Sequence, residues 1–219
     1  EAQLAFTAFL NANPDADQLI IYTPTSDVQA LAAVAVLEAL GRVGDAIVVG
    51  HGGDVQIRPE LSDCDSPVKA SIGYFPDRYG EFLLPMITDI LTGQPVNKTV
   101  FVEHEAITCE NISEFYPDDV QALAADEGPY LIGFAQLLTS GCDFCADVEN
   151  GMKEVLEGAG HELFVLDNEF DVDISVANAD MMVTKGADIV IFFGPGAAYP
   201  VVHQKMRDAE IPLIFMDGL

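Results

Sequence analysis

Residues 186–217 read GADIVIFFGPGAAYPVVHQKMRDAEIPLIFMD, and this stretch decides the fold. Two short apolar runs, at 188–193 and 211–217, flank a segment of helical periodicity at 199–209. Continuous apolar runs of this length are typical of strands buried on both faces of a parallel sheet, and parallel strands need a crossover such as a helix between them. The stretch therefore predicts a strand–helix–strand unit.

The same alternation extends towards the N-terminus. Apolar runs at 130–134 and 162–167 predict two more strands, and Gly160 and Gly186 end helices predicted at 143–159 and 174–184. Residues 130–217 thus read β-α-β-α-β-α-β, which is a doubly wound half-domain. In such sheets ligands bind outside the carboxyl ends of the strands.

The first half of the chain repeats this pattern. Ser26 and Asp27 are placed to cap a helix directly after an apolar run, and Gly41 stops that helix. A second α/β unit is therefore expected, with helices at 3–10, 27–40 and 77–91 and strands at 18–22, 45–50, 69–74 and 99–103.

Composition excludes several function classes. Of the 219 residues 50% are hydrophobic, so the chain can bury a sizeable core. The net charge of −27 comes from 36 acidic against 9 basic residues, and such a surface repels phosphates and anionic membranes. No stretch approaches the roughly 18 apolar residues of a membrane span. We therefore expect no nucleic-acid partner and no membrane insertion.

The four cysteines permit two disulfides in three possible pairings. Cys142 and Cys145 have redox-motif spacing at a helix start, but a local disulfide or two packed thiols is the favoured interpretation. Cys64 and Cys109 can form the second bridge. Export would allow both bridges to form, although residues 1–10 show no basic region followed by an apolar run.

Two further motifs do not support a cofactor or an enzyme. Residues 167–173 carry acidic side chains at alternating positions, but they lack the central glycine and distal glutamate of a calcium loop, which favours a solvated turn. Residues 194–196 read Gly-Pro-Gly, where the third glycine of a dinucleotide motif is absent and proline removes an amide donor. No nucleophile arrangement is present. We expect no cofactor, no metal and no catalysis.

The segments resemble a known family, the type I periplasmic sugar-binding proteins of ABC importers (ribose-binding type). Residues 132–167, with IGFAQ and DFCADVENGMKEVLEGAGHELFVLD, match its first strand, first helix and second strand. Residues 186–217 match the third strand, third helix and fourth strand. The runs at 10–42 (LNANPDADQLIIYTPTSDVQALAAVAVLEALGR), 73–96 (GYFPDRYGEFLLPMITDILTGQPV) and 105–117 (EAITCENISEFYP) are similar to the other end of the family's chain.

The resemblance implies a permuted order, because the family's end comes first and its beginning second, while a middle part has no counterpart. A permutation, a tandem junction and an incomplete record all remain open. The fold class implied is α/β, with doubly wound, Rossmann-like parallel sheets in two lobes, one of them incomplete. The implied division is 1–60 and 97–116 in the carboxy-terminal lobe, 61–96 returning to the amino-terminal lobe, 117–129 as a linker, and 130–219 as the amino-terminal lobe.

The resemblance also places ligand contacts. The loop after the first strand of the 130–219 lobe holds Cys142, Asp143 and Phe144, with Phe144 as a stacking ring or, alternatively, a packing residue under the helix. Asp217 matches a carboxylate that pairs with sugar hydroxyls, and its alternative role is a turn or cap. Tyr74 stands where an amide is common and can stack, donate or pack in a core.

Residues 50–54 depart from the family's pattern. The family ends this strand with Gly-hydrophobe-Asp-Gly, whereas this chain reads Gly-His-Gly-Gly-Asp. Either His51 or Asp54 is expected to replace the missing aspartate, so the ligand need not be an ordinary pentose or hexose.

The implied function is capture of a sugar or similar small polar solute for the permease of an ABC importer, without catalysis or cofactor, in the periplasm or outside the cell. The first alternative is a ligand-sensing module of a receptor with the same fold. The second alternative is a nucleotide-dependent enzyme of doubly wound fold.

Overall fold

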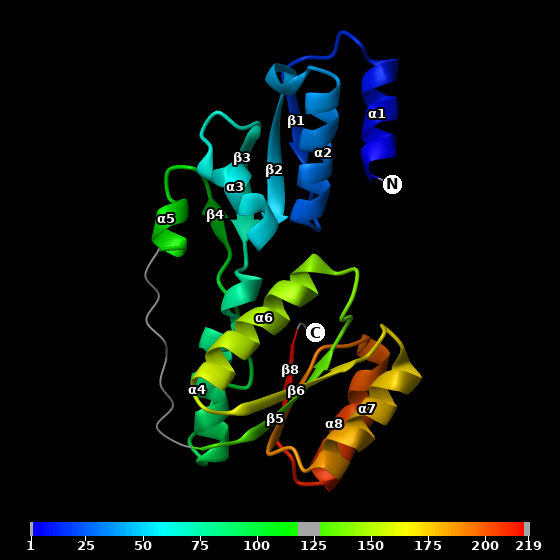
Figure 1. Cartoon of the computed structure of the whole chain (residues 1–219). Helices are drawn as coiled ribbons and strands as arrows, with labels where there is room; N and C mark the ends of the chain where they lie inside the picture. Colours follow the sequence, from blue (N-terminus) through cyan, green and yellow to red (C-terminus); the bar gives the residue numbers. More distant parts are fainter. Residues whose placement is uncertain (1, 118–127, 217–219) are drawn as a thin grey trace. The chain divides into compact units, whose positions relative to one another are not determined.

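The computed structural model describes residues 2–117 and 128–216, which form two compact units (Figure 1). Unit 1 comprises residues 1–76 and 101–120, and unit 2 comprises residues 77–100 and 121–219. The chain passes from unit 1 to unit 2 between Pro76 and Asp77.

Unit 1 is built on a four-stranded sheet in the order β1-β2-β3-β4. β1 (Leu19–Tyr22), β2 (Ala46–Gly52) and β3 (Val68–Gly73) are parallel, and β4 (Glu105–Ile107) runs antiparallel to β3. The apolar runs expected at 18–22, 45–50 and 69–74 are therefore strands, each shifted by one or two residues.

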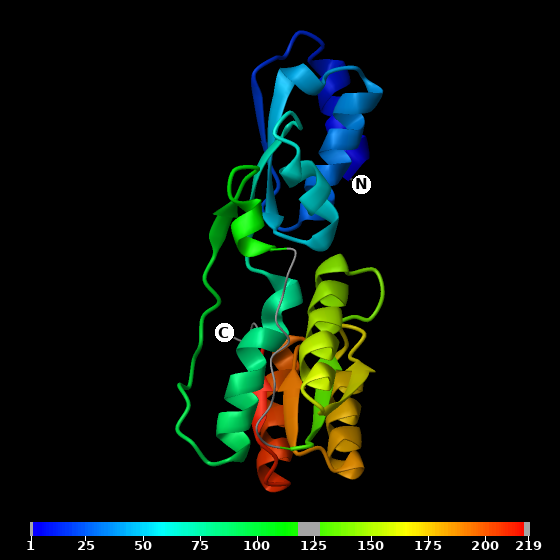
Figure 2. The same cartoon turned by 60° about the vertical axis from the view of Figure 1, so that its left-hand side comes forward.

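The helices of unit 1 gather on one side of its sheet (Figure 2). α2 (Asp27–Ala39), capped by Ser26, packs on β2, and α1 (Ala2–Ala12) packs on α2. α3 (Arg58–Ser62) packs on β3 and contacts α5 (Ile112–Phe115). The buried apolar residues form one cluster: Leu10, Ala30, Val34, Val36, Leu37, Ala46, Val48, Ile57, Leu61, Val68, Phe75 and Ile107.

The strand expected at 99–103 is wrong. Residues 99–104 have no regular structure, and Phe101 is 79% exposed. Pairing begins at Glu105 instead, where Ile107 lies opposite Ser71 and is fully buried. An apolar run forms a strand only where a neighbouring strand is available to pair with it. Here β3 pairs with residues 105–107, which follow the apolar run at 99–103.

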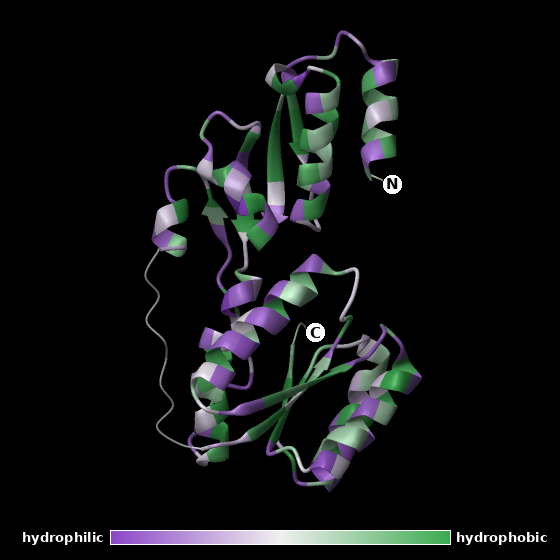
Figure 3. Ribbon diagram, in the orientation of Figure 1, coloured by the Kyte–Doolittle hydropathy of each residue, from purple (hydrophilic) through white to green (hydrophobic). Residues whose placement is uncertain are grey.

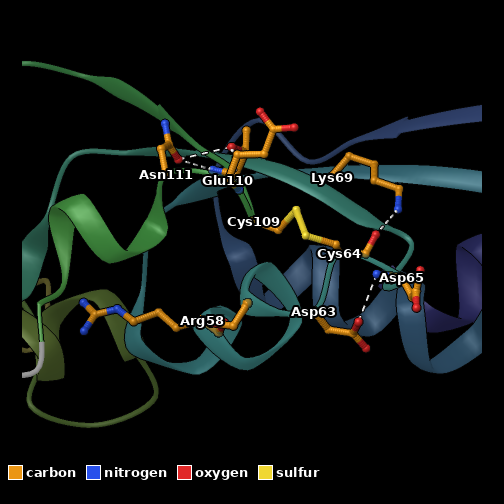
Figure 4. Close-up of a disulfide and its surroundings, with 10 residues drawn as sticks. Arg58, Asp63, Cys64, Asp65, Lys69, Cys109, Glu110 and Asn111 are labelled. Atoms are coloured by element: carbon orange, nitrogen blue, oxygen red, sulfur yellow. Dashed lines mark hydrogen bonds between the residues drawn. A yellow bond between two sulfur atoms is a disulfide. The ribbon is translucent and has the colours of Figure 1, made fainter.

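A disulfide joins Cys64, in the loop before β3, to Cys109, just after β4 (Figure 4). Beside it, the Asn111 side chain accepts a hydrogen bond from the Thr108 amide at 2.7 Å and donates to the Ala106 carbonyl. The pairing left open by the sequence is therefore Cys64 with Cys109, and the bridge ties β4 and the segment after it to the parallel part of the sheet.

Unit 2 confirms the predicted β-α-β-α-β-α-β half-domain. Its sheet has the order β6-β5-β7-β8 with every pair parallel. The strands are coloured mainly as hydrophobic in Figure 3, as expected for strands covered on both faces. Their bounds are Leu131–Gln136 (β5), Glu162–Asp167 (β6), Ile189–Phe192 (β7) and Leu213–Phe215 (β8).

Two pairs of helices cover this second sheet (Figure 1). α6 (Asp143–Gly158) packs with α4 (Tyr79–Leu91), and α7 (Val172–Lys185) packs with α8 (Tyr199–Asp208). α7 begins at Asp171, whose carboxylate accepts from two amides, and ends at Gly186 in the left-handed conformation that glycine adopts without strain. The end of α7 at Gly186 was predicted from the sequence, whereas the helix begins at Val172, two residues before the predicted 174.

The buried imidazole of His161 makes the stability of unit 2 sensitive to pH. The ring is 5% exposed, it accepts a hydrogen bond from the Tyr130 amide on Nδ1 at 3.4 Å, and its Nε2 is buried without a partner in the part of the chain that the structure describes. Burial lowers the pKa of His161 below its usual value of about 6.5.

The pKa of His161 is lower in the folded state than in the unfolded state. As the pH falls, the unfolded chain therefore takes up the proton at a higher pH than the folded chain does. The stabilisation is therefore present above about pH 6.5 and is lost as the pH falls. We expect the melting temperature of unit 2 to drop between about pH 7.5 and about pH 5.5. His161→Leu should flatten this dependence, whereas His203→Gln, at an exposed site on α8, should leave it unchanged. Equal slopes in the wild type and His161→Leu would contradict the assignment.

Candidate functional site

Four rings meet where the parallel strands of unit 1 end. Tyr22 ends β1, His51 lies near the end of β2, Tyr74 follows β3, and His104 precedes β4. The His51 ring contacts those of Tyr74, His104 and Tyr22, with centroids 5.3, 6.3 and 6.4 Å apart, and the Tyr74 and His104 centroids are 5.4 Å apart. We call these four residues the ring cluster.

The orientation of His51 is fixed by the backbone. Its Nδ1 lies 2.5 Å from the carbonyl oxygen of Pro24. A carbonyl only accepts hydrogen bonds, so Nδ1 carries the proton and donates it. In the neutral ring Nε2 then keeps its lone pair. With His51 and His104 partly or fully exposed, the ring cluster offers ring faces together with imidazole and phenol groups to a solute.

The sequence predicted two members of the ring cluster and missed two. His51 and Tyr74 were expected, and the structure brings them together. Tyr22 ended a predicted strand, so its place at the carboxyl edge was readable. His104 was not singled out, because the strand was expected at 99–103, whereas His104 lies directly before β4, which runs antiparallel to β3.

Asp54, the other residue expected to replace the family's aspartate, does not join the ring cluster. It is 2% exposed, and its amide donates to the Asp27 carboxylate at 3.0 Å. Asp27 is fully buried at the start of α2, where its oxygens also accept from the Ser71 hydroxyl at 2.7 and 3.0 Å. The Ser71 oxygen accepts from the Gly53 amide. These contacts hold the loop after β2.

This buried network explains two glycines at the end of β2. A Cβ at Gly50 would lie 2.0 Å from Asp27 Oδ1, and one at Gly52 would lie 2.6 Å from Asp54 Oδ1. The chain therefore needs glycine here so that the two carboxyl groups can lie against the strand. Residues 50–54, which depart from the family's pattern, therefore pack around two buried carboxyl groups, and Asp54 does not present an exposed carboxylate.

In unit 2 the predicted loop residues lie at the carboxyl end of β5. Phe144 is half-buried and makes edge-to-face contacts with Phe193 and Tyr79, at centroid distances of 6.1 and 6.0 Å. Asp143 is exposed in the first turn of α6. Cys142 caps α6, and its sulfur is bonded to Cys145. The local disulfide is therefore confirmed, and the Cys142 sulfur is not a free thiol.

Two buried amides at this edge were missed by the sequence analysis. Gln136 ends β5 with no exposure and donates through Nε2 to the Cys145 carbonyl and to Glu149, at 2.9 and 3.1 Å. Asn168 follows β6, is equally buried and donates to the Phe193 carbonyl at 2.9 Å. The predicted strand ended at 134, so Gln136 was not recognised as its last residue. The amides fix the loops that follow three strands.

Asp167 is a carboxyl group at this edge whose pKa is displaced. Partial burial raises the pKa, but hydrogen bonds from the Thr139 hydroxyl and from the amides of Glu169 and Thr139 outweigh it, so the pKa lies below its usual range. The carboxylate stays ionised and holds the loop after β5. The acidic run at 167–173 thus serves turns and the cap of α7.

Asp217 lies outside the described residues. Within 2–117 and 128–216 no group of three His, Cys, Asp or Glu side chains is placed to hold a metal ion. Over the same residues no helix is both long and apolar enough to cross a membrane.

Comparisons with known proteins identify this fold. No protein-family model matches the chain, and no curated protein matches it either. The chain is similar to the crystal structure of a glucose-galactose binding protein from Geobacillus stearothermophilus, with a TM-score of 0.56 and 11% identity over 99% of this chain and 62% of that one.

Two further solved structures are similar. One is a carbohydrate transporter from Acidothermus cellulolyticus 11B in complex with myo-inositol, with a TM-score of 0.52 and 14% identity over 98% of this chain and 58% of that one. The other is a sugar transporter from Clostridium phytofermentans, with a TM-score of 0.51 and 10% identity over 97% and 62%. This chain spans about three fifths of each. At these identities the likeness shows the fold, which is that of type I periplasmic binding proteins.

Proposed function

We propose that this chain captures a sugar or a similar small polar molecule for the permease of an ABC importer, without catalysis. The observation that carries the proposal is the fold, whose solved examples include proteins described as glucose-galactose binding or holding myo-inositol. The strand ends of each unit carry the side chains that such a role needs. Aromatic rings stack on the apolar faces of a sugar, and polar groups bond its hydroxyls.

The proposed order of segments is the reverse of the family's. Residues 1–60 and 97–116 then belong to the lobe that comes second in the family, and residues 130–219 form the lobe that comes first. Residues 61–96 are the segment that returns to that first lobe. The linker is 117–129.

The proposed ligand contacts differ in role. His51 and Tyr74, with Tyr22 and His104, offer rings and polar tips from unit 1. Phe144, Asp143 and Asp217 act from unit 2, with Phe144 as the ring and the two carboxylates as acceptors for hydroxyl groups. Cys142 and Asp54 act indirectly, because one is tied into a disulfide and the other is buried.

The proposed location is the periplasm or the outside of the cell. Two disulfides include all four cysteines, and such bonds persist in oxidising compartments. The acidic surface, with a net charge of −27, keeps an exported protein soluble.

A thermal-shift screen tests the proposal. We expect D-glucose, D-galactose or myo-inositol to raise the melting temperature, because a ligand that binds only the folded state stabilises it by about 2.7 kcal/mol at a hundred times its Kd. Tyr74→Ala and Asp217→Ala should reduce the shift, and Phe101→Ala, at a ring that is 79% exposed outside the ring cluster, should not.

The two readouts separate function from site. No shift with these three compounds, or with a wider set of polyols, would argue against solute capture by this chain. A shift that survives both substitutions would keep the function and remove these residues from the site.

A further inference from the structure

The bridge between Cys142 and Cys145 joins an accessible residue to a buried one. Both cysteines lie at the start of α6, a helix of 16 residues that follows β5 and its loop. Cys142 is partly exposed, whereas Cys145 has no exposure. Exchange with a thiol requires access to the sulfur that is attacked. A thiol in solution therefore reaches this bridge through Cys142.

The start of α6 stabilises negative charge on the Cys142 sulfur. That sulfur caps the helix and accepts a hydrogen bond from the Cys145 amide at 3.1 Å. The unpaired amides of a first helical turn and the helix dipole favour an anion at this position. A thiolate at Cys142 keeps the same amide contact. A thiolate that is stabilised in this way leaves a disulfide faster.

Contacts that do not involve sulfur hold both cysteines in place. Phe144 lies between them in the chain, and its ring makes edge-to-face contacts with Tyr79 and Phe193. The Cys145 carbonyl accepts a hydrogen bond from Gln136 Nε2 at 2.9 Å. Opening the bridge breaks none of these contacts. The two thiols therefore stay within reach of one another, so the bridge can close again.

A buried acceptor beside Cys145 lacks a donor while the bridge is closed. Gln136 Nε2 donates to the Cys145 carbonyl and to the Glu149 carboxylate, which fixes the orientation of the amide. Gln136 Oε1 is buried and has no hydrogen-bond partner among the residues that the structure describes. A disulfide has no hydrogen to donate, whereas a thiol is a weak donor. Opening the bridge adds a donor to the residue that Gln136 already contacts, which favours the dithiol form.

The surroundings of the Cys64–Cys109 bridge differ in charge and in local structure. Three carboxyl groups are next to its cysteines in the chain, those of Asp63, Asp65 and Glu110, and they repel an approaching thiolate. Cys109 precedes α5, which has only four residues, and Cys64 lies in the loop before β3. This bridge therefore lacks a long helix that could stabilise a leaving thiolate, and we expect it to exchange slowly.

We infer that the Cys142–Cys145 bridge is a site of thiol–disulfide exchange, at which a small-molecule thiol attacks the Cys142 sulfur. In the first step the attacking thiolate forms a mixed disulfide with Cys142, and the bond to Cys145 breaks, so that Cys145 leaves as a thiolate and takes up a proton. In the second step another thiolate attacks the sulfur of the attached molecule, which leaves as its oxidised disulfide, and the Cys142 thiolate is released. Two thiols are oxidised, and the bridge is reduced to two thiols. This activity is independent of the proposed solute capture.

The test exposes the whole folded chain to graded ratios of reduced to oxidised glutathione. Free thiols are then alkylated and located by mass spectrometry of peptides. We expect Cys142–Cys145 to open on the order of tenfold faster than Cys64–Cys109. In Cys145→Ser, oxidised glutathione should form a mixed disulfide on Cys142. In Cys142→Ser, the remaining thiol should react on the order of tenfold more slowly, because Cys145 is buried.

The results separate a reactive site from a merely exposed or unfolded one. Circular dichroism of each variant should match that of the wild type. A bridge that stays closed at every glutathione ratio, or two bridges that open at equal rates, would overturn the inference. So would equal reaction of the two single thiols. If a variant does not fold, early quenching of the wild-type reaction decides instead, since glutathione attached to Cys142 supports the inference and glutathione attached to Cys145 contradicts it.

Discussion

Gly151→Ala is expected to destabilise unit 2 by about 3 kcal/mol, at the upper end of what overpacking usually costs. Gly151 lies in the middle of α6, and a Cβ there would lie 1.8 Å from the carbonyl oxygen of Asp77 and 2.5 Å from its carbon. Gly80, in the first turn of α4, faces it, since a Cβ at Gly80 would lie 2.7 Å from the Gly151 carbonyl oxygen. These atoms belong to backbone, which cannot turn away as a side chain does.

The matched control lies in the same helix. Gly158 ends α6 without a positive φ, and a Cβ added there would meet nothing within 4 Å, so Gly158→Ala should be neutral or stabilising by up to about 1 kcal/mol. Urea unfolding followed by circular dichroism measures both variants. Equal midpoints for the two would mean that α4 and α6 do not approach through their glycines.

The strands and helices of unit 2 were predictable because each signal is local. The β6 run is apolar, bounded by Gly160 and by an acidic turn, and its predicted bounds 162–167 are those observed. Close contacts such as that of Gly151 with Asp77 were not predictable. A glycine inside a helix looks like a defect in sequence, and only the packed partner shows why it is there.

The residues of the candidate site also divide into those that the sequence could place and those that it could not. Strand ends can be located from apolar runs, and the family resemblance then singled out His51 and Tyr74 near two of them. Burial cannot be located that way, because an aspartate in a Gly-rich loop has the same sequence signal whether it faces solvent or the core. Asp54 was expected as a ligand and is buried, and Asp27 was expected as part of a cap and is the acceptor of the network.

Removing the Cys64–Cys109 bridge by a double serine substitution is expected to destabilise unit 1 by about 4 kcal/mol. The bridge closes a loop with a sequence separation of 45, and the chain-entropy cost of leaving such a loop open in the unfolded state sets the size of the effect. In the folded unit the segment it ties down is also held by the pairing of the three residues of β4 with β3, and by the Tyr116 hydroxyl, which donates to the Gly53 carbonyl at 3.2 Å.

The second disulfide supplies the comparison. Cys142 and Cys145 are separated by 3, so the same entropy argument gives only about 1.5 kcal/mol. Serine at 142 also keeps an oxygen to cap α6, so that the helix start is preserved. The two double variants should therefore differ by about 2.5 kcal/mol in urea unfolding under non-reducing conditions. If both lost the same stability, the long loop would not constrain the unfolded chain, and the Cys64–Cys109 bridge would act through local contacts such as those of Asn111.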